Sequence, residues 1–241
     1  MTGSERRKSL FIASEVRCGS TFIAETLAYE LNRTFGFELW DLTKEHFRYL
    51  DGTSAAEDAL KTWRSLYLDA SGFVASKFMC KGLSMLHRLA RRSEPVREAF
   101  FGRDAHWVVV RRSDRIEQAV SLALASKTGA YHFYDDPRQA PDHDATLTPP
   151  EVVWAFKALA LSDSYLEEFA RAPPNALKIE FEYNEFLEDQ VGHVNRVHAL
   201  CGFPALDRAS FVNQSKLKRT ARALKNSASE EFRRWFLENH V

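Results

Sequence analysis

The sequence predicts an α/β fold in which a central, mainly parallel sheet is flanked by helices, giving three layers. Two observations support this class. Short runs rich in β-branched and aromatic residues are each followed by a segment of helical periodicity, several times along the chain. The run "HWVVVRR" (106–112) is almost entirely apolar before its arginines, as in a parallel strand covered on both faces. At 241 residues, the whole chain, 1–241, is predicted to form a single domain.

The first half of the chain contains two of the predicted strand-to-helix units. "SLFIAS" (9–14) is expected to form a buried strand, and residues 20–34 the helix that follows it. "GFVASKFM" (72–79) is expected to form a second strand, followed by the amphipathic helix "LSMLHRLARR" (83–92).

The second half of the chain carries clearer helix boundaries. Asp114 is a predicted N-cap for a helix over 115–127, after the strand 106–112. The density of Pro and Asp in 134–150 indicates a loop. The remaining expected features are a capping box of Thr148 and Glu151 that starts a helix through about residue 171, a strand over 176–183, and a helix over 186–201 that Gly202 closes.

Composition excludes several broad classes of function. The formal net charge is +0, from 33 basic and 33 acidic residues, so no nucleic-acid partner is expected. No apolar run approaches the roughly 18 residues of a membrane helix, so no membrane span is expected. The three cysteines are widely spaced and lie in no zinc motif, and the start of the sequence lacks the apolar segment of a signal peptide, which together predict a cytoplasmic protein.

The turn between the first strand and its helix combines Arg17, Gly19, Ser20 and Thr21. Backbone N–H groups at a helix N-terminus favour an anion, glycine permits a close or left-handed backbone, and the arginine and hydroxyls add donors. The turn is shorter than a GxxxxGK[ST] nucleotide loop, which occurs nowhere in the chain. The alternative from these residues alone is a plain Ser20 N-cap beside a surface arginine.

A second strand-to-helix turn repeats this arrangement. Arg112 ends a strand, and Ser121 lies along the following helix, on the same face as Gln118. Carboxyl ends of parallel strands meet at one edge of a sheet, where ligands bind. Two anion sites at that edge indicate a ligand with phosphates at both ends of a nucleoside, and no carboxylates are placed for a magnesium ion.

These segments resemble known motifs. "IASEVRCGSTFIAETL" is similar to the 5′-phosphosulfate loop of bacterial sulfotransferases of the trehalose 2-sulfotransferase type, and "RRSDRIEQAVS" to a second motif of that family. "KFMCKG" is similar to a third. The resemblance implies a P-loop-like fold and transfer of a sulfuryl group from 3′-phosphoadenosine 5′-phosphosulfate (PAPS), without a metal, to a hydroxyl of a carbohydrate, glycolipid or other small acceptor.

The resemblance also implies roles for particular residues. The donor-binding residues are those that match the two motifs, namely Arg17, Cys18, Gly19, Ser20, Thr21, Arg112 and Ser121. Arg17 would neutralise charge on the leaving oxygen. Glu38 matches the position of the catalytic carboxylate, and Glu45 has a similar sequence context. The residues expected near the acceptor are Glu45, Lys77, Lys127 and Tyr131, and Lys77 could reach the donor instead.

The C-terminal basic segment, 213–241, is expected to pack at the nucleotide site, although a solvated helix face is the alternative. A homodimer is plausible by analogy, with nothing in the sequence that decides it. Two other functions stay open at this point. One is a kinase-like phosphotransferase, which would need a nucleotide-loop lysine and magnesium ligands. The other is a catalytically inactive nucleotide-binding protein of the same fold, which Val16 and Cys18 favour slightly because they depart from the family pattern.

Overall fold

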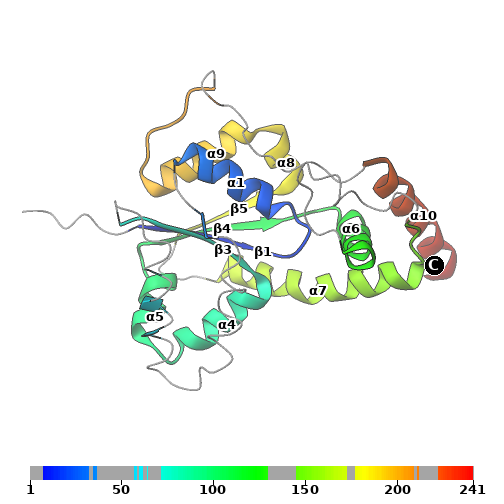
Figure 1. Ribbon diagram of the computed structural model, residues 1–241, viewed down its shortest axis with the longest axis horizontal. Helices are drawn as coiled ribbons and strands as arrows, with labels where there is room; N and C mark the ends of the chain where they lie inside the picture. Colours follow the sequence, from blue (N-terminus) through cyan, green and yellow to red (C-terminus); the bar gives the residue numbers. More distant parts are fainter. Residues whose placement is uncertain are drawn as a thin grey trace, which may run out of the picture.

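The computed structural model contains one parallel sheet with helices on both faces (Figure 1). It describes residues 8–32, 35–36, 57–58, 60–61, 64, 72–129, 145–172, 177–208, 211 and 222–240. The strands are β1 Ser9–Ser14, β2 Phe35–Gly36, β3 Val74–Met79, β4 Ala105–Arg111 and β5 Leu177–Glu182, in the order β2-β3-β1-β4-β5. The helices are α1 Ser20–Glu30, α4 Cys80–Ala90, α5 Glu94–Phe101, α6 Arg115–Thr128, α7 Pro149–Arg171, α8 Tyr183–Glu188, α9 Gln190–Cys201 and α10 Arg222–His240.

Side chains alternate between the two faces of the sheet and form two separate cores. Phe11 and Trp107 point to the face that α4, α5 and α7 cover, whereas Ile12 and Val108 point to the face that α1, α8 and α9 cover (Figure 1). All four side chains are fully buried. The predicted three-layer α/β fold with a parallel central sheet is therefore confirmed.

The strand register brings four strand ends to one edge of the sheet. Ser14, the last residue of β1, pairs with Met79 of β3 and with Val110 of β4, and Arg111 of β4 pairs with Glu182 of β5. The turns that leave these strands therefore begin side by side. Residues 15–19, 112–114 and 182–183 lie at this edge.

Local capping patterns correctly predicted several helix ends. The Asp114 side chain caps α6 by accepting a hydrogen bond from the backbone N–H of Glu117. Thr148 and Glu151 form the expected capping box of α7, and Gly202 ends α9 with a left-handed φ of 74°. Each of these ends is decided by contacts within a few residues, which is why the sequence predicts them.

Other elements differ from the sequence prediction. The helix expected over 186–201 is interrupted at Asp189, whose side chain accepts from the backbone N–H of Gly192 and starts α9 as a new helix. Helix α1 ends at Glu30, earlier than residue 34. Helices α5 and α10 and the two-residue strand β2 were not predicted. Of the expected loop 134–150, only its last residues, from 145, lie in the described part of the chain.

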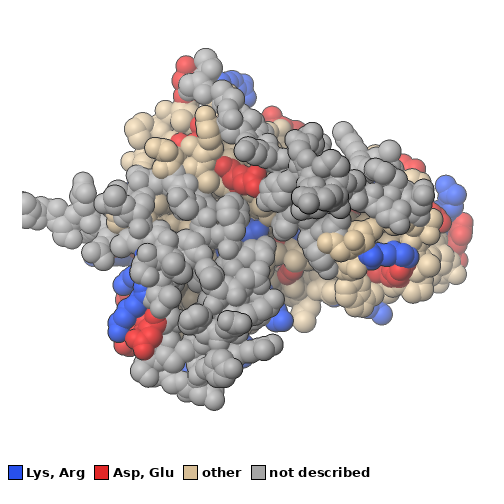
Figure 2. All heavy atoms as spheres, in the orientation of Figure 1, with Lys and Arg blue, Asp and Glu red and all other residues tan. Residues whose placement is uncertain are grey.

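Two features of the described residues bear on the class of protein. No described helix is both long enough and apolar enough to cross a bilayer. In the same part of the chain, no group of three or more His, Cys, Asp or Glu side chains is placed to hold a metal ion. On the face shown in Figure 2, the described Lys and Arg residues are scattered among Asp and Glu rather than gathered in one basic surface.

Candidate functional site

The turn after β1 has an unusual backbone. Arg17 has a φ of 61° and Gly19 a φ of 85°, so two of its residues are left-handed. A Cβ atom on Gly19 would lie 2.1 Å from Cε2 of Tyr183, which packs directly over this glycine. Glycine is therefore required here for two reasons, the left-handed φ and the close approach of the ring. The sequence predicted a left-handed or closely approached backbone at Gly19, and the structure shows both, with the Tyr183 ring as the group that approaches.

Helix α1 begins at this turn without a side-chain cap among the described residues, because its N-cap is Gly19. The plain Ser20 N-cap considered from the sequence is therefore wrong. The first N–H groups of a helix have no partners within the helix, and they lie at the positive end of its dipole. This arrangement leaves the first turn of α1 suited to an anion, and Ser20 itself is buried there.

Lys77 lies beside this first turn. It is 2% exposed and projects from β3, the neighbour of β1, so that its Nζ donates to Oγ1 of Thr21 at 2.8 Å. Of the two positions considered for Lys77, the structure therefore places it at the loop predicted to bind the donor. A buried ammonium at a helix N-terminus strengthens the local positive potential, because both charges have the same sign.

Arg17 joins this turn to the second predicted anion site. Its Nε donates to Oγ of Ser121 on α6 at 3.0 Å, and its backbone carbonyl accepts from Nη1 of Arg112 at 3.3 Å. Gln118, which is fully buried one turn before Ser121, donates from Nε2 to the carbonyl of Val16 at 2.8 Å. The two sites predicted separately from the sequence are therefore in direct contact.

The Arg112 guanidinium is almost entirely enclosed, with 7% of its side chain exposed. Its Nη2 lies 2.5 Å from Oε2 of Glu117, and its Cζ lies 5.3 Å from the centre of the Tyr183 ring, which is a cation–π distance. Its Nε is buried and has no hydrogen-bond partner among the described residues. Such a donor is available to an acceptor from outside these residues, such as a ligand oxygen or a water molecule.

Glu182 fixes the relative positions of these turns. Its side chain caps α8 by accepting from the backbone N–H groups of Asn184 and Glu185, and it also accepts from the N–H and Oγ of Ser113, both at 2.9 Å. Burial alone would raise the pKa of Glu182, but the hydrogen bonds from Ser113 and the start of α8 outweigh it and lower the pKa. Glu182 thus holds the turn after Arg112 against the start of α8.

A second connection runs from α7 to the turn after β1. Arg115 forms an ion pair with Asp163 of α7 at 2.8 Å, and it donates to Oε1 of Gln118 at 3.0 Å. Gln118 in turn binds Val16. Burial raises the pKa of Asp163 to about 6, although Arg115 opposes the rise. The turn after β1 is therefore connected through Gln118 and Arg115 of α6 to α7.

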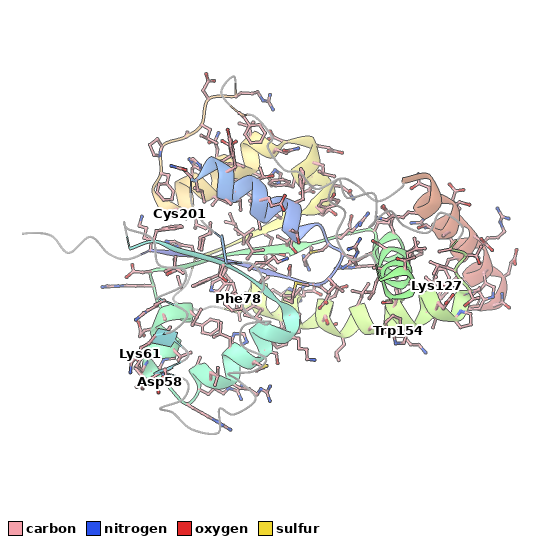
Figure 3. All side chains as sticks on the ribbon, in the orientation of Figure 1. Asp58, Lys61, Phe78, Lys127, Trp154 and Cys201 are labelled. Atoms are coloured by element: carbon pink, nitrogen blue, oxygen red, sulfur yellow. The ribbon has the colours of Figure 1, made fainter. Side chains whose placement is uncertain are left out.

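Two predicted site residues point elsewhere. The Cys18 side chain is 1% exposed and belongs to the core under α1, and burial raises the pKa of its thiol, so only its backbone faces the turn. Lys127 lies near the other end of α6, about 18 Å along the helix from Arg115. There it pairs with Glu151 at 2.9 Å and holds the start of α7 (Figure 3).

Glu38, Glu45 and Tyr131 lie outside the described residues, so the catalytic carboxylate and part of the acceptor site remain predictions. Glu117, Glu182 and Tyr183 were missed as site residues. The signal for Glu182 was present, since an acidic residue between a strand and a helix is a typical N-cap. No local signal indicated that Tyr183 covers Gly19 or that Glu117 pairs with Arg112, because these contacts depend on how the turns meet.

The C-terminal helix contacts this region through one ion pair. Arg233 of α10 donates from Nη2 to both oxygens of Asp114, at 2.9 and 2.8 Å, and Asp114 caps α6 two residues after Arg112. Figure 1 shows α10 beside α6 and α7. The basic residues 216–221 lie outside the described part of the chain, so packing of 213–241 at the nucleotide site remains a prediction.

Together, the fold and these turns define an α/β protein in which positively charged groups gather at the carboxyl edge of the sheet. A family model described as Stf0 sulphotransferase matches residues 76–199, which is 124 of the 241 residues. The chain therefore belongs to the Stf0 sulphotransferase family, and it is a sulfotransferase. The matched region contains Arg112 and Ser121 and begins after the turn at 15–19. The family expected from the sequence motifs is confirmed.

Solved structures similar to this chain include enzymes of two kinds. A sulfotransferase from Alicyclobacillus acidocaldarius is 14% identical, with a TM-score of 0.48, over 95% of this chain and 92% of that one. A mouse sulfotransferase complexed with PAP is 15% identical, with a TM-score of 0.44, over 97% and 83%. A shikimate kinase from Bacteroides thetaiotaomicron is 13% identical, with a TM-score of 0.41, over 81% and 99%. No curated protein matches this chain.

Proposed function

We propose that this enzyme transfers the sulfuryl group of PAPS to a hydroxyl of a carbohydrate, glycolipid or other small acceptor. One observation carries the proposal within the sulfotransferase family. Three cations meet at the carboxyl edge of the sheet, where Lys77 donates to Thr21 in the first turn of α1 and Arg112 donates to the carbonyl of Arg17 in the turn before it. Lys77 and Arg112 are buried, and buried positive charge beside a helix N-terminus favours an anionic ligand.

The residues present fit the two charged ends of PAPS. The first-turn N–H groups of α1, with Thr21 and Lys77 beside them, suit the 5′-phosphosulfate because they combine a helix N-terminus with a buried ammonium. Arg112 and Ser121 are proposed to hold the 3′-phosphate. The unsatisfied Nε of Arg112 supports this role, since a phosphate oxygen would supply the acceptor that it lacks.

The proposed chemistry is an in-line displacement at sulfur. A bond forms between the acceptor oxygen and sulfur, the bond from sulfur to the bridging oxygen of the 5′-phosphate breaks, and the acceptor proton passes to a carboxylate. Glu38 is the proposed base, with Glu45 as the other candidate. Arg17 would stabilise the charge that develops on the leaving oxygen, which requires its side chain to exchange Ser121 for the donor. We propose that no metal takes part.

The acceptor site is assigned only in outline. Lys127 and Tyr131 are proposed near the acceptor from the family resemblance, but the ion pair of Lys127 with Glu151 points to a structural contribution in the ligand-free protein. A cytoplasmic location and a homodimer remain predictions.

The donor assignment can be tested by calorimetry with 3′-phosphoadenosine 5′-phosphate (PAP), 5′-AMP and ATP with Mg²⁺. PAP should bind more tightly than the other two, and Arg112→Gln should weaken PAP by about 1–3 kcal/mol while leaving 5′-AMP nearly unchanged. A preference for ATP would favour the kinase-like alternative and refute the proposal.

Turnover with labelled PAPS and a panel of hydroxyl acceptors tests the catalytic assignment. Glu38→Gln should lower kcat by about 10²–10⁴ and keep the affinity for PAP. Glu45→Gln is the matched comparison, and the variant with the larger loss identifies the base. Binding of PAP without turnover of any acceptor would instead support the inactive nucleotide-binding alternative.

A further inference from the structure

One edge of the Arg112 guanidinium is only partly satisfied, and the carboxylate of Glu117 occupies part of it. In a guanidinium group, Nε and Nη2 lie along one edge and together form the fork that binds a phosphate or carboxylate. In this protein, Glu117 occupies the Nη2 half of that edge through one oxygen, and the Nε half has no partner among the described residues. The other nitrogen, Nη1, donates to the carbonyl of Arg17.

Glu117 is placed so that it could leave this position. It is the third residue of α6, and its backbone N–H is held by the Asp114 cap at 2.9 Å, so its backbone is fixed. Its side chain is 26% exposed, whereas that of Arg112 is 7% exposed. Rotation about the side-chain bonds can therefore move the Glu117 carboxylate into water, while Arg112 is confined by Tyr183 and the Arg17 carbonyl.

We propose that Glu117 is an internal counter-anion that competes with the 3′-phosphate for Arg112 and so sets the affinity and selectivity for 3′-phosphorylated nucleotides. The inference rests on the proposed function, because it assumes that Arg112 binds the 3′-phosphate. A phosphate that used both Nε and Nη2 would meet the Glu117 carboxylate at the same edge, and two anions so close repel each other. Binding then requires Glu117 to turn outwards.

Opposite effects on stability and on binding follow from this arrangement. Without nucleotide, Glu117 neutralises a buried cation, so its removal should destabilise the protein. With nucleotide, the 3′-phosphate supplies that negative charge, and removal of Glu117 should strengthen binding. A residue that only supports the local structure would give the same sign in both measurements, because a disturbed site both unfolds more easily and binds more weakly.

Glu117→Gln is the variant that tests this inference, and Glu180→Gln is its matched control. Glu180 forms an ion pair with Arg111, the residue before Arg112, at 2.8 Å, but its side chain is 47% exposed. Glu117→Asp keeps the charge on a shorter side chain. Each protein is titrated by calorimetry with PAP and with 5′-AMP, which lacks the 3′-phosphate, and its thermal unfolding is followed without nucleotide.

Glu117→Gln should bind PAP about tenfold more tightly than the wild type, bind 5′-AMP unchanged, and unfold at a lower temperature without nucleotide. The PAP affinity of Glu117→Asp should fall between those of the wild type and Glu117→Gln, and Glu180→Gln should leave PAP affinity unchanged. If the wild type prefers PAP to 5′-AMP but Glu117→Gln binds PAP equally or more weakly, the inference is overturned and the proposed function stands. If neither protein prefers PAP, both fail.

Discussion

Gly19→Ala is expected to be the most informative single substitution in the loop. At this position, alanine must adopt a φ of 85°, and its Cβ would lie 2.1 Å from the Tyr183 ring. Left-handed backbone costs a residue with a Cβ about 1–2 kcal/mol, and forcing an atom into a packed contact costs about 1–3 kcal/mol more. The free energy of unfolding should therefore fall by about 2–5 kcal/mol.

Gly129→Ala provides a matched control for the backbone contribution. Gly129 ends α6 with a φ of 73°, and no atom of the described residues lies within 4 Å of the position of its Cβ. This variant should lose only the backbone contribution of about 1–2 kcal/mol. The difference between the two variants, measured by urea unfolding, isolates the steric contact with Tyr183.

A double-mutant cycle tests whether Tyr183 is the source of that difference. The ring also lies at a cation–π distance from the Arg112 guanidinium, so a movement of the ring would alter that contact. In the background of Tyr183→Ala, the Gly19→Ala substitution should cost no more than Gly129→Ala does in the wild type. The reasoning fails if Gly19→Ala and Gly129→Ala are equally destabilising in the wild type, or if the cycle is additive.

Two further predictions concern pH and stability, and both are checked by urea unfolding at a series of pH values. Burial raises the pKa of Asp163 to about 6 despite the nearby Arg115, so the charged carboxylate lowers stability as the pH rises from about 4 through 6. Asp163→Asn should therefore be more stable than the wild type at pH 7 by about 1–3 kcal/mol and equal to it near pH 4, and an unchanged pH profile would contradict this. The pKa of Glu151 is lowered to about 2, first by the N–H of Thr148 and then by Lys127, so its contribution is present above pH 4.5 and is lost as the pH falls towards 2. Glu151→Ala should lose about 1 kcal/mol at pH 7, a modest value because the pair is partly exposed, and it should match the wild type near pH 2.

Several helix ends were predictable because the interactions that decide them are local. The Asp114 cap and the capping box of Thr148 with Glu151 each involve side chains within three residues of the group they satisfy. The break at Asp189 was missed because apolar residues continue at helical spacing on both sides of it, and only its cap reveals a new helix start. Periodicity detects a buried face, but it does not detect an interruption that keeps the same face buried.

For the site, the sequence predicted which charged residues meet, but not the partner of each one. Parallel topology required Arg17 and Arg112 to meet at one edge of the sheet, and they do. The partner of each charge was not predictable. Glu117 and Ser121 both lie on the helix after Arg112, and the sequence pattern does not indicate that Glu117 contacts Arg112 while Ser121 contacts Arg17. Lys127 shows the same limitation, because its partner Glu151 comes from the next helix.

The contacts of Arg17 connect the two predicted anion sites. Its left-handed backbone turns the carbonyl towards Arg112 while its side chain reaches Ser121, so one strained residue satisfies both sides. Glu117 completes the arrangement by neutralising Arg112. In the structure, the charges of this edge therefore interact largely with one another. The proposed donor would replace these internal contacts with its own. Its affinity would then reflect the difference between the two sets of interactions. Removal of a residue that takes part only in the internal contacts can therefore raise the affinity for the donor.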